Sequence, residues 1–111
     1  MRTLIDENEL GLIRDKLKLK LKFHLQKIIL FGSQATNKAD EKSDIDLLVI
    51  SHFHGKRRQL MVEMNRIMDN VEHAIDLLIL TPGEFNREKK IPGTLARYAG
   101  EHGRIIYEQP S

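Results

Sequence analysis

The sequence predicts an α+β fold, a mixed β-sheet with helices packed mainly on one of its faces. Three runs dominated by Ile, Leu and Val, at residues 27–31, 44–50 and 74–80, have the length and composition of buried strands. Other stretches repeat apolar residues every three or four positions, as amphipathic helices do. The resulting order of elements, αββαβααβ, suits helices layered on one sheet, and 111 residues suit a single domain over residues 1–111.

The first helix is expected from Asp6, with Glu9 as its capping-box partner, to about His24. Apolar residues then recur at helical spacing, at Leu10, Ile13, Leu17 and Leu21. Residues 17–23 also alternate apolar residues with Lys, which is a strand signal, so the two interpretations conflict. We favour the helix, because Leu and Lys are good helix formers and the strand at 27–31 needs a connection before it.

The middle of the chain is expected to form a strand, a helix and another strand. The polar residues 37–43 lead into the strand at 44–50. Apolar residues at helical spacing then predict a helix over about 56–69, namely Leu60, Met61, Met64, Ile67 and Met68. We interpret the methionines as core filler. The strand at 74–80 follows this helix.

Two short helices and a last strand complete the expected fold. Thr81-Pro82-Gly83-Glu84 combines an N-cap, a first-turn proline and an acid at the third helical position, a pattern that opens a helix. Pro92-Gly93-Thr94 opens another helix, which stops near Gly103, and residues 105–107 form the final strand.

Three aspartates stand where two of the apolar strands begin. Asp44 and Asp46 are two residues apart and so share one face of their strand, and Asp76 holds the matching place on the next strand. If the two strands are neighbours, the three carboxylates converge within about 5 Å and repel one another unless cations bind. The sequence therefore predicts two Mg²⁺ ions about 3.5–4 Å apart, held by Asp44, Asp46 and Asp76. Asp76 either holds a metal or accepts a proton, and both roles stay open.

A glycine–serine turn precedes these acids. Gly32 and Ser33 end the first strand, ten residues before Asp44, and can bring a backbone N–H and a hydroxyl onto the β- or γ-phosphate of a nucleotide. The turn is not a P-loop, because the Gly-Lys-Ser/Thr ending is absent.

Composition narrows the classes of function. The net charge of +2 comes from interspersed Lys, Arg, Asp and Glu, and the chain has no Trp, so direct nucleic-acid binding is not expected. Without cysteine there is no thiolate metal site or cysteine nucleophile. No apolar stretch has the length of a membrane span, and the N-terminus lacks a signal core, so a cytoplasmic protein is expected.

With these residues in view, the chain resembles the minimal nucleotidyltransferases (MNT proteins) of the DNA polymerase beta-like superfamily. Their signature is Gly-Ser, ten residues and Asp-x-Asp, which Gly32-Ser33 and Asp44-Ile45-Asp46 match in spacing, and Asp76 matches their third acid. The resemblance implies Mg²⁺ and ATP at the acids. The nucleotide contacts it implies are Gly32, Ser33, Gln34 and Ser43.

The resemblance also implies a function and a partner. Minimal members are often antitoxins that transfer AMP from ATP to a tyrosine of a HEPN-domain ribonuclease toxin. We expect this AMPylation activity, with a HEPN toxin as the partner in a hetero-oligomer. Transfer to a small molecule such as an aminoglycoside stays a weaker alternative, because relatives of that kind usually add a helical domain to hold the drug.

Three positions depart from the family pattern. The family frequently has arginine after Gly-Ser and again after the alanine, followed by glycine, whereas this chain has Gln34, Thr36 and Asn37. Each lost arginine removes charge-assisted contacts worth roughly 1.5–3 kcal/mol where they are buried. A second hypothesis follows, in which the chain neutralises its toxin by binding alone.

Overall fold

Four strands and five helical segments make up the part of the chain that the computed structural model describes, residues 7–32, 45–71 and 73–110. In chain order they are α1 (Glu7–Leu21), the 3-10 turn η1 (Lys22–His24), β1 (Leu25–Phe31), β2 (Ile45–Ser51), α3 (Arg57–Arg66), β3 (Ile75–Leu80), α4 (Pro82–Glu88), α5 (Leu95–His102) and β4 (Arg104–Glu108). Within these ranges no helix is both long enough and apolar enough to cross a membrane.

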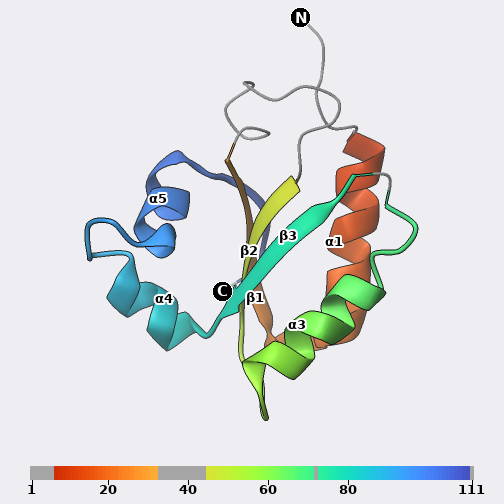
Figure 1. The fold of residues 1–111 in the computed structure, drawn as a ribbon, viewed down its shortest axis with the longest axis horizontal. Coiled ribbons are helices and arrows are strands. Elements are labelled where there is room, and N and C mark those ends of the chain that lie inside the picture. Colours follow the sequence, from red (N-terminus) through yellow and green to blue (C-terminus); the bar gives the residue numbers. More distant parts are fainter. Residues whose placement is uncertain (1–6, 33–44, 72, 111) are drawn as a thin grey trace, which may run out of the picture.

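The four strands form one mixed sheet in the order β3-β2-β1-β4. β1 runs antiparallel to β2 and to β4, whereas β2 and β3 are parallel and are joined by the crossover through α3. The start of β2, the start of β3 and the end of β1 therefore lie at the same edge of the sheet (Figure 1).

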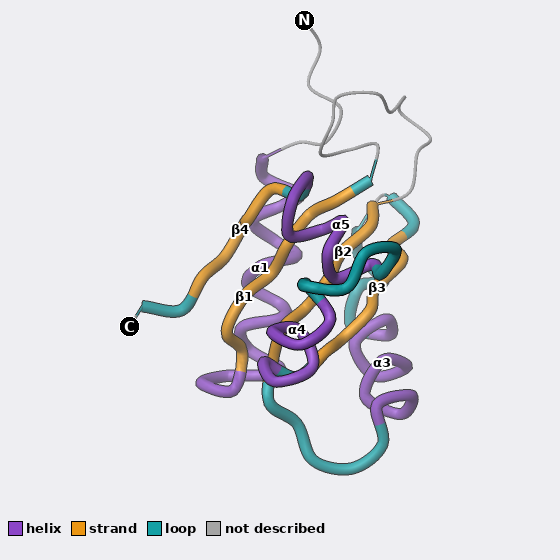
Figure 2. Tube along the Cα trace, turned by 90° about the vertical axis from the view of Figure 1, so that its left-hand side faces the viewer, coloured by secondary structure: helices purple, strands orange, loops and turns teal. Residues whose placement is uncertain are grey.

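Helices cover both faces of the sheet (Figures 1 and 2). The longer helices α1 and α3 share one face, where Ile13 and Met64 are buried against the strands. The short helices α4 and α5 pack on the other face, where Phe85 and Ala99 are buried with Leu48. The predicted α+β class and mixed sheet are confirmed, and the second face carries a smaller core of its own.

The helical interpretation of residues 17–23 is confirmed for most of its length. α1 continues to Leu21, η1 forms the connection, and β1 begins at Leu25. Of the apolar residues in the alternating run, Leu17 and Leu21 are buried, whereas Leu19 and Phe23 are exposed, as helical spacing requires. Lys20 pairs with Glu63 of α3 at 2.7 Å. The predicted middle helix at about 56–69 was four residues too long, because α3 begins at Arg57 and ends at Arg66. Its Met64 is core filler, as expected.

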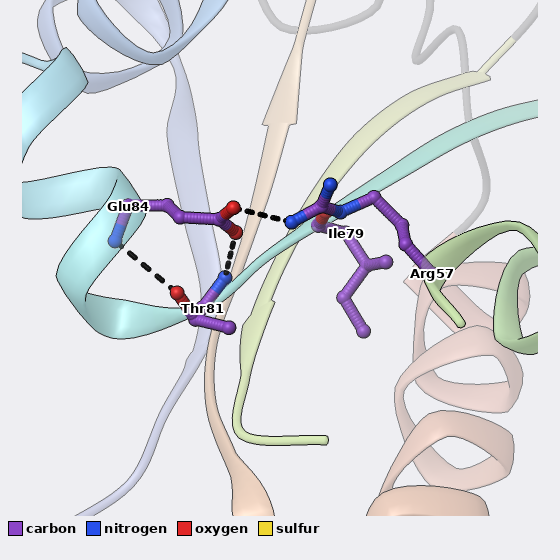
Figure 3. A network of polar contacts seen from close by, with 4 residues as sticks. All are labelled: Arg57, Ile79, Thr81 and Glu84. Carbon is purple, nitrogen blue, oxygen red and sulfur yellow. Dashed lines mark hydrogen bonds and ion pairs between the residues drawn. The ribbon is translucent and has the colours of Figure 1, made fainter. Parts of the chain in front are cut away.

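A polar network joins the start of α3 to the start of α4 (Figure 3). The predicted N-cap is confirmed as a capping box: Thr81 Oγ1 accepts from the Glu84 N–H at 3.2 Å, and Glu84 Oε1 accepts from the Thr81 N–H at 2.9 Å. Arg57 donates to the Glu84 carboxylate and, through Nε, to the Ile79 carbonyl at 3.1 Å. The network therefore links both helices to the end of β3.

Glu84→Gln is expected to lower the free energy of unfolding by about 1 kcal/mol at pH 7, the scale of a helix-cap interaction. The backbone hydrogen bond from Thr81, followed by Arg57, holds the pKa of Glu84 below its ordinary value of 4.5. A lowered folded-state pKa contributes stability above pH 4.5 that is lost as the pH falls through the folded value. The difference between parent and variant should therefore shrink in acid.

Urea unfolding of both proteins at pH 7 and near pH 3 measures this difference. Glu88→Gln is the matched control, because it removes the same charge from the same helix without the bonds to Thr81 and Arg57. A deficit for Glu84→Gln that is equal at both pH values would show that the carboxylate charge is not what stabilises the two helix starts.

Candidate functional site

Two of the predicted acids are direct neighbours across the sheet. Asp46 of β2 and Asp76 of β3 are register partners in the parallel ladder, which places their Cα atoms about 4.8 Å apart. The condition set by the sequence, that the two acid-bearing strands adjoin, is thus met. Strand alternation puts both carboxylates on the same face as Leu48 and Leu80, the face covered by α4 and α5.

The turn after β1 contacts Asp46 on the side opposite β3. Phe31, the last residue of β1, is the register partner of Asp46, and Gly32 follows it with a φ of +75°. A Cβ on Gly32 would overlap Oδ2 of Asp46 and lie 3.2 Å from its Cγ. Position 32 therefore requires glycine for two reasons: the backbone is left-handed, and it approaches the carboxylate closely.

Gly32, Asp46 and Asp76 are thus brought together at one edge of the sheet. The other predicted site residues lie outside the described part of the chain: Ser33, Gln34, Ser43 and Asp44. Over the ranges 7–32, 45–71 and 73–110, no cluster of three or more His, Cys, Asp or Glu side chains has the arrangement of a metal site. The predicted triad is represented there by two of its members.

The chemistry of this pair fits a hard divalent cation. Asp46 is half-buried and Asp76 is exposed, so the carboxylates meet at an edge that a ligand can reach. Among the described residues, Asp76 has no salt-bridge partner, although a second carboxylate stands beside it. Neighbouring carboxylates repel one another, and carboxylate oxygens are the ligands that Mg²⁺ prefers. Asp46 and Asp76 can therefore hold the predicted metal.

An aromatic cluster borders the acids, and no motif in the sequence marks it. The ring of Tyr98, on α5, packs edge-on against Phe31 with 6.4 Å between centroids, and the His102 ring lies 5.1 Å beyond it. Because Phe31 pairs with Asp46, the cluster adjoins the acid edge on the same face of the sheet. The spacing of Tyr98 and His102, one helical turn apart, is the one sequence signal that could have linked them.

Comparison of the sequence with known families and proteins gives a consistent result. A family model described as "Polymerase beta, Nucleotidyltransferase" matches residues 15–111. Two proteins of Methanocaldococcus jannaschii, both named "putative protein adenylyltransferase", are similar. MJ0126 is 35% identical over 78 residues, which cover 70% of this chain and 79% of that protein. MJ0604 is 29% identical over 96 residues, covering 82% and 87%.

Solved structures with the same fold include antitoxins bound to their toxins. A toxin–antitoxin structure with AMP-PNP superposes with a TM-score of 0.64 at 18% identity, over 95% of this chain and 75% of that one. The MNT antitoxin of Shewanella oneidensis, in complex with a tri-AMPylated HEPN toxin, has a TM-score of 0.63 at 18% identity, over 95% and 74%. The spectinomycin adenyltransferase of Enterococcus faecialis reaches 0.63 at 15% identity, over 96% and 58%.

Proposed function

We propose a specific reaction for this chain, which belongs to the polymerase beta nucleotidyltransferase family and is a nucleotidyltransferase. The reaction is the Mg²⁺-dependent transfer of AMP from ATP to a tyrosine hydroxyl of a HEPN-domain toxin, which makes the chain an antitoxin. The observation that carries this proposal is the cross-strand pair Asp46 and Asp76, with Gly32 closed against it. We place the reaction in the cytoplasm, where ATP is available.

The chemistry assigned to the residues is an in-line displacement at the α-phosphorus. The acceptor oxygen forms a bond to this phosphorus, the bond to the bridging oxygen of the β-phosphate breaks, and pyrophosphate leaves with the electron pair. Asp44, Asp46 and Asp76 would hold the metal, which when bound would neutralise the developing phosphate charge. Asp76, exposed at the edge, would either share in holding the metal or accept the hydroxyl proton. Gly32 and Ser33 are assigned to the β- and γ-phosphates, and Gln34 and Ser43 are assigned as further nucleotide contacts.

A protein acceptor is favoured by the relatives and by the fold neighbours. Both M. jannaschii relatives bear the name of protein adenylyltransferases. Two of the fold neighbours come from toxin–antitoxin complexes, one of them with a tri-AMPylated toxin. Transfer to an antibiotic therefore ranks below transfer to a protein.

Neutralisation by binding alone is the second candidate function. Gln34 and Thr36 stand where the family frequently has arginines, so the triphosphate loses two cationic contacts. In this hypothesis the fold and the toxin surface remain, and the nucleotide site has decayed.

Mass spectrometry distinguishes these functions. A candidate HEPN-domain toxin, taken from the genes that neighbour the gene for this chain, is incubated with the chain, ATP and Mg²⁺, and its intact mass is measured. One or more added AMP units, mapped to tyrosine and lost with Asp76→Asn, are the expected result. A stable complex with no added mass, together with retained neutralisation by the Asp44→Ala/Asp46→Ala double variant, would favour the binding hypothesis and overturn the transfer reaction.

A further inference from the structure

We propose that Tyr98 of α5 is the stacking platform for the adenine base of the nucleotide. The inference rests on the proposed function and adds to it a binding site for the part of ATP that the acids and the glycine turn do not reach. It starts from the position of α5 beside the acid edge and from the exposed Tyr98 ring.

The orientation of α5 turns Tyr98 toward the acids. Ala96 and Ala99 are buried against the sheet, and a Cβ on Gly100 would lie 3.8 Å from the Phe85 ring of α4. Phe85 packs with the carboxyl-terminal parts of β2 and β3, the ends opposite the acids. Tyr98 instead contacts Phe31, at the end of β1 that pairs with Asp46 near the start of β2.

Phe31 connects this flank to the acid pair. Phe31 is the register partner of Asp46 on the neighbouring strand. Its ring contacts the Tyr98 ring on the same face of the sheet. Tyr98 and Asp46 are therefore separated by one strand spacing, about 4.8 Å, and the thickness of one aromatic contact. If a nucleotide binds with its α-phosphate at Asp46 and extends toward β1, its base lies beside Tyr98.

The Tyr98 ring is available to a ligand. It is 44% exposed, and its hydroxyl forms no hydrogen bond within the described part of the chain. Beside it lies a hollow of about 300 Å³, which is also lined by Thr94, Arg97 and Glu101. Proteins commonly stack nucleobases on an aromatic ring that packs against the protein on one side and faces solvent on the other. The neighbouring polar groups can contact the edge of a base.

Binding measurements with two probes separate the base from the phosphates. Isothermal titration of the full chain with AMP-PNP and with inorganic tripolyphosphate, each with Mg²⁺, compares a ligand that has the base with one that lacks it. Tyr98→Ala should weaken AMP-PNP binding about tenfold, within the range of one base–aromatic stack, and leave tripolyphosphate binding within about twofold. Tyr98→Phe should bind both probes like the parent.

Tyr98→Leu controls for the possibility that Tyr98→Ala weakens binding through lost packing on Phe31. Leucine keeps an apolar contact but removes the stacking face, so it should reproduce the loss for AMP-PNP alone. Retained tripolyphosphate binding shows that the acid edge of each variant is intact.

Tyrosine fluorescence gives a second measurement that needs no catalysis. The chain has two tyrosines and no tryptophan, and Tyr107 lies on the opposite face beneath Lys18. In a Tyr107→Phe background, Tyr98 is the single tyrosine reporter. AMP-PNP should quench it after correction for absorption by the base, and tripolyphosphate should not.

Three outcomes would count against the inference. Equal AMP-PNP affinity in parent, Tyr98→Ala and Tyr98→Leu, with tripolyphosphate still bound, overturns the stacking site and leaves the proposed function standing. Equal affinity combined with a raised KM for the protein acceptor also overturns it, and assigns Tyr98 to acceptor docking. Failure of the parent to bind either probe overturns the nucleotide site of the proposed function, and the stacking site with it.

Discussion

Asp46→Asn should reduce AMP transfer by at least about a thousandfold, because it removes a metal ligand charge worth several kcal/mol in the transition state. The substitution keeps the size of the side chain and one of its oxygens. It also relieves repulsion between Asp46 and Asp76, which are direct cross-strand partners. The variant should therefore stay folded in urea unfolding while transfer is lost.

Initial rates of AMP transfer and urea unfolding of the same preparations give the two quantities. Asp15→Asn is the matched control, since it removes the same charge from an exposed position on α1, on the opposite face of the sheet. Its rate should equal that of the parent. Transfer by Asp46→Asn within tenfold of the parent would exclude the acid pair as the metal site.

The sequence predicted the acid edge because every signal involved is local. Apolar runs mark the strands, and strand alternation predicted Asp44 and Asp46 on one face, although Asp44 lies outside the described residues. The pairing of Asp46 with Asp76 was conditional on neighbouring strands, and the structure supplies that condition through the parallel pairing of β2 and β3. A helix between two strands, here α3, is the usual connection for such pairing, so the condition itself had a physical basis.

The second helical layer was less apparent from the pattern of elements. β1 and β2 contain continuous apolar runs, Ile28-Ile29-Leu30 and Leu47-Leu48-Val49, which predict burial on both faces rather than one. The structure confirms this, because Ile29 and Leu48 belong to a core covered by α4 and α5. The composition of the central strands was therefore the better guide to the number of layers.

Contacts between distant side chains could not be predicted. The bond of Arg57 to Glu84 spans 27 positions and depends on where α3 begins relative to the end of β3. The contact of Tyr98 with Phe31 depends on how α5 lies over β1, which no local propensity determines. Both are set by the packing of elements, so the sequence indicates their residue types without indicating their partners.

Gly32→Ala should lower AMP transfer about a hundredfold, because the new methyl group displaces the Asp46 carboxylate and a shift near 1 Å can cost that much. The left-handed backbone at Gly32 adds about 1–2 kcal/mol of strain, which alone would lower stability without touching the site. Gly55→Ala separates the two effects. Gly55 has a φ of +84°, yet a Cβ there meets no atom within 4 Å.

Both alanine variants should therefore lose stability in urea unfolding, Gly32→Ala at least as much as Gly55→Ala, while only Gly32→Ala loses transfer. Comparing the two variants separates the effect of moving Asp46 on transfer from the effect of backbone strain on stability. Activity measurements on one variant cannot separate them. Equal losses of transfer in the two variants would mean that stability, rather than the approach of the glycine turn to Asp46, limits the reaction. Normal transfer by Gly32→Ala would mean that the carboxylate works equally well after it moves, and that the close packing of turn and acid is not part of the site.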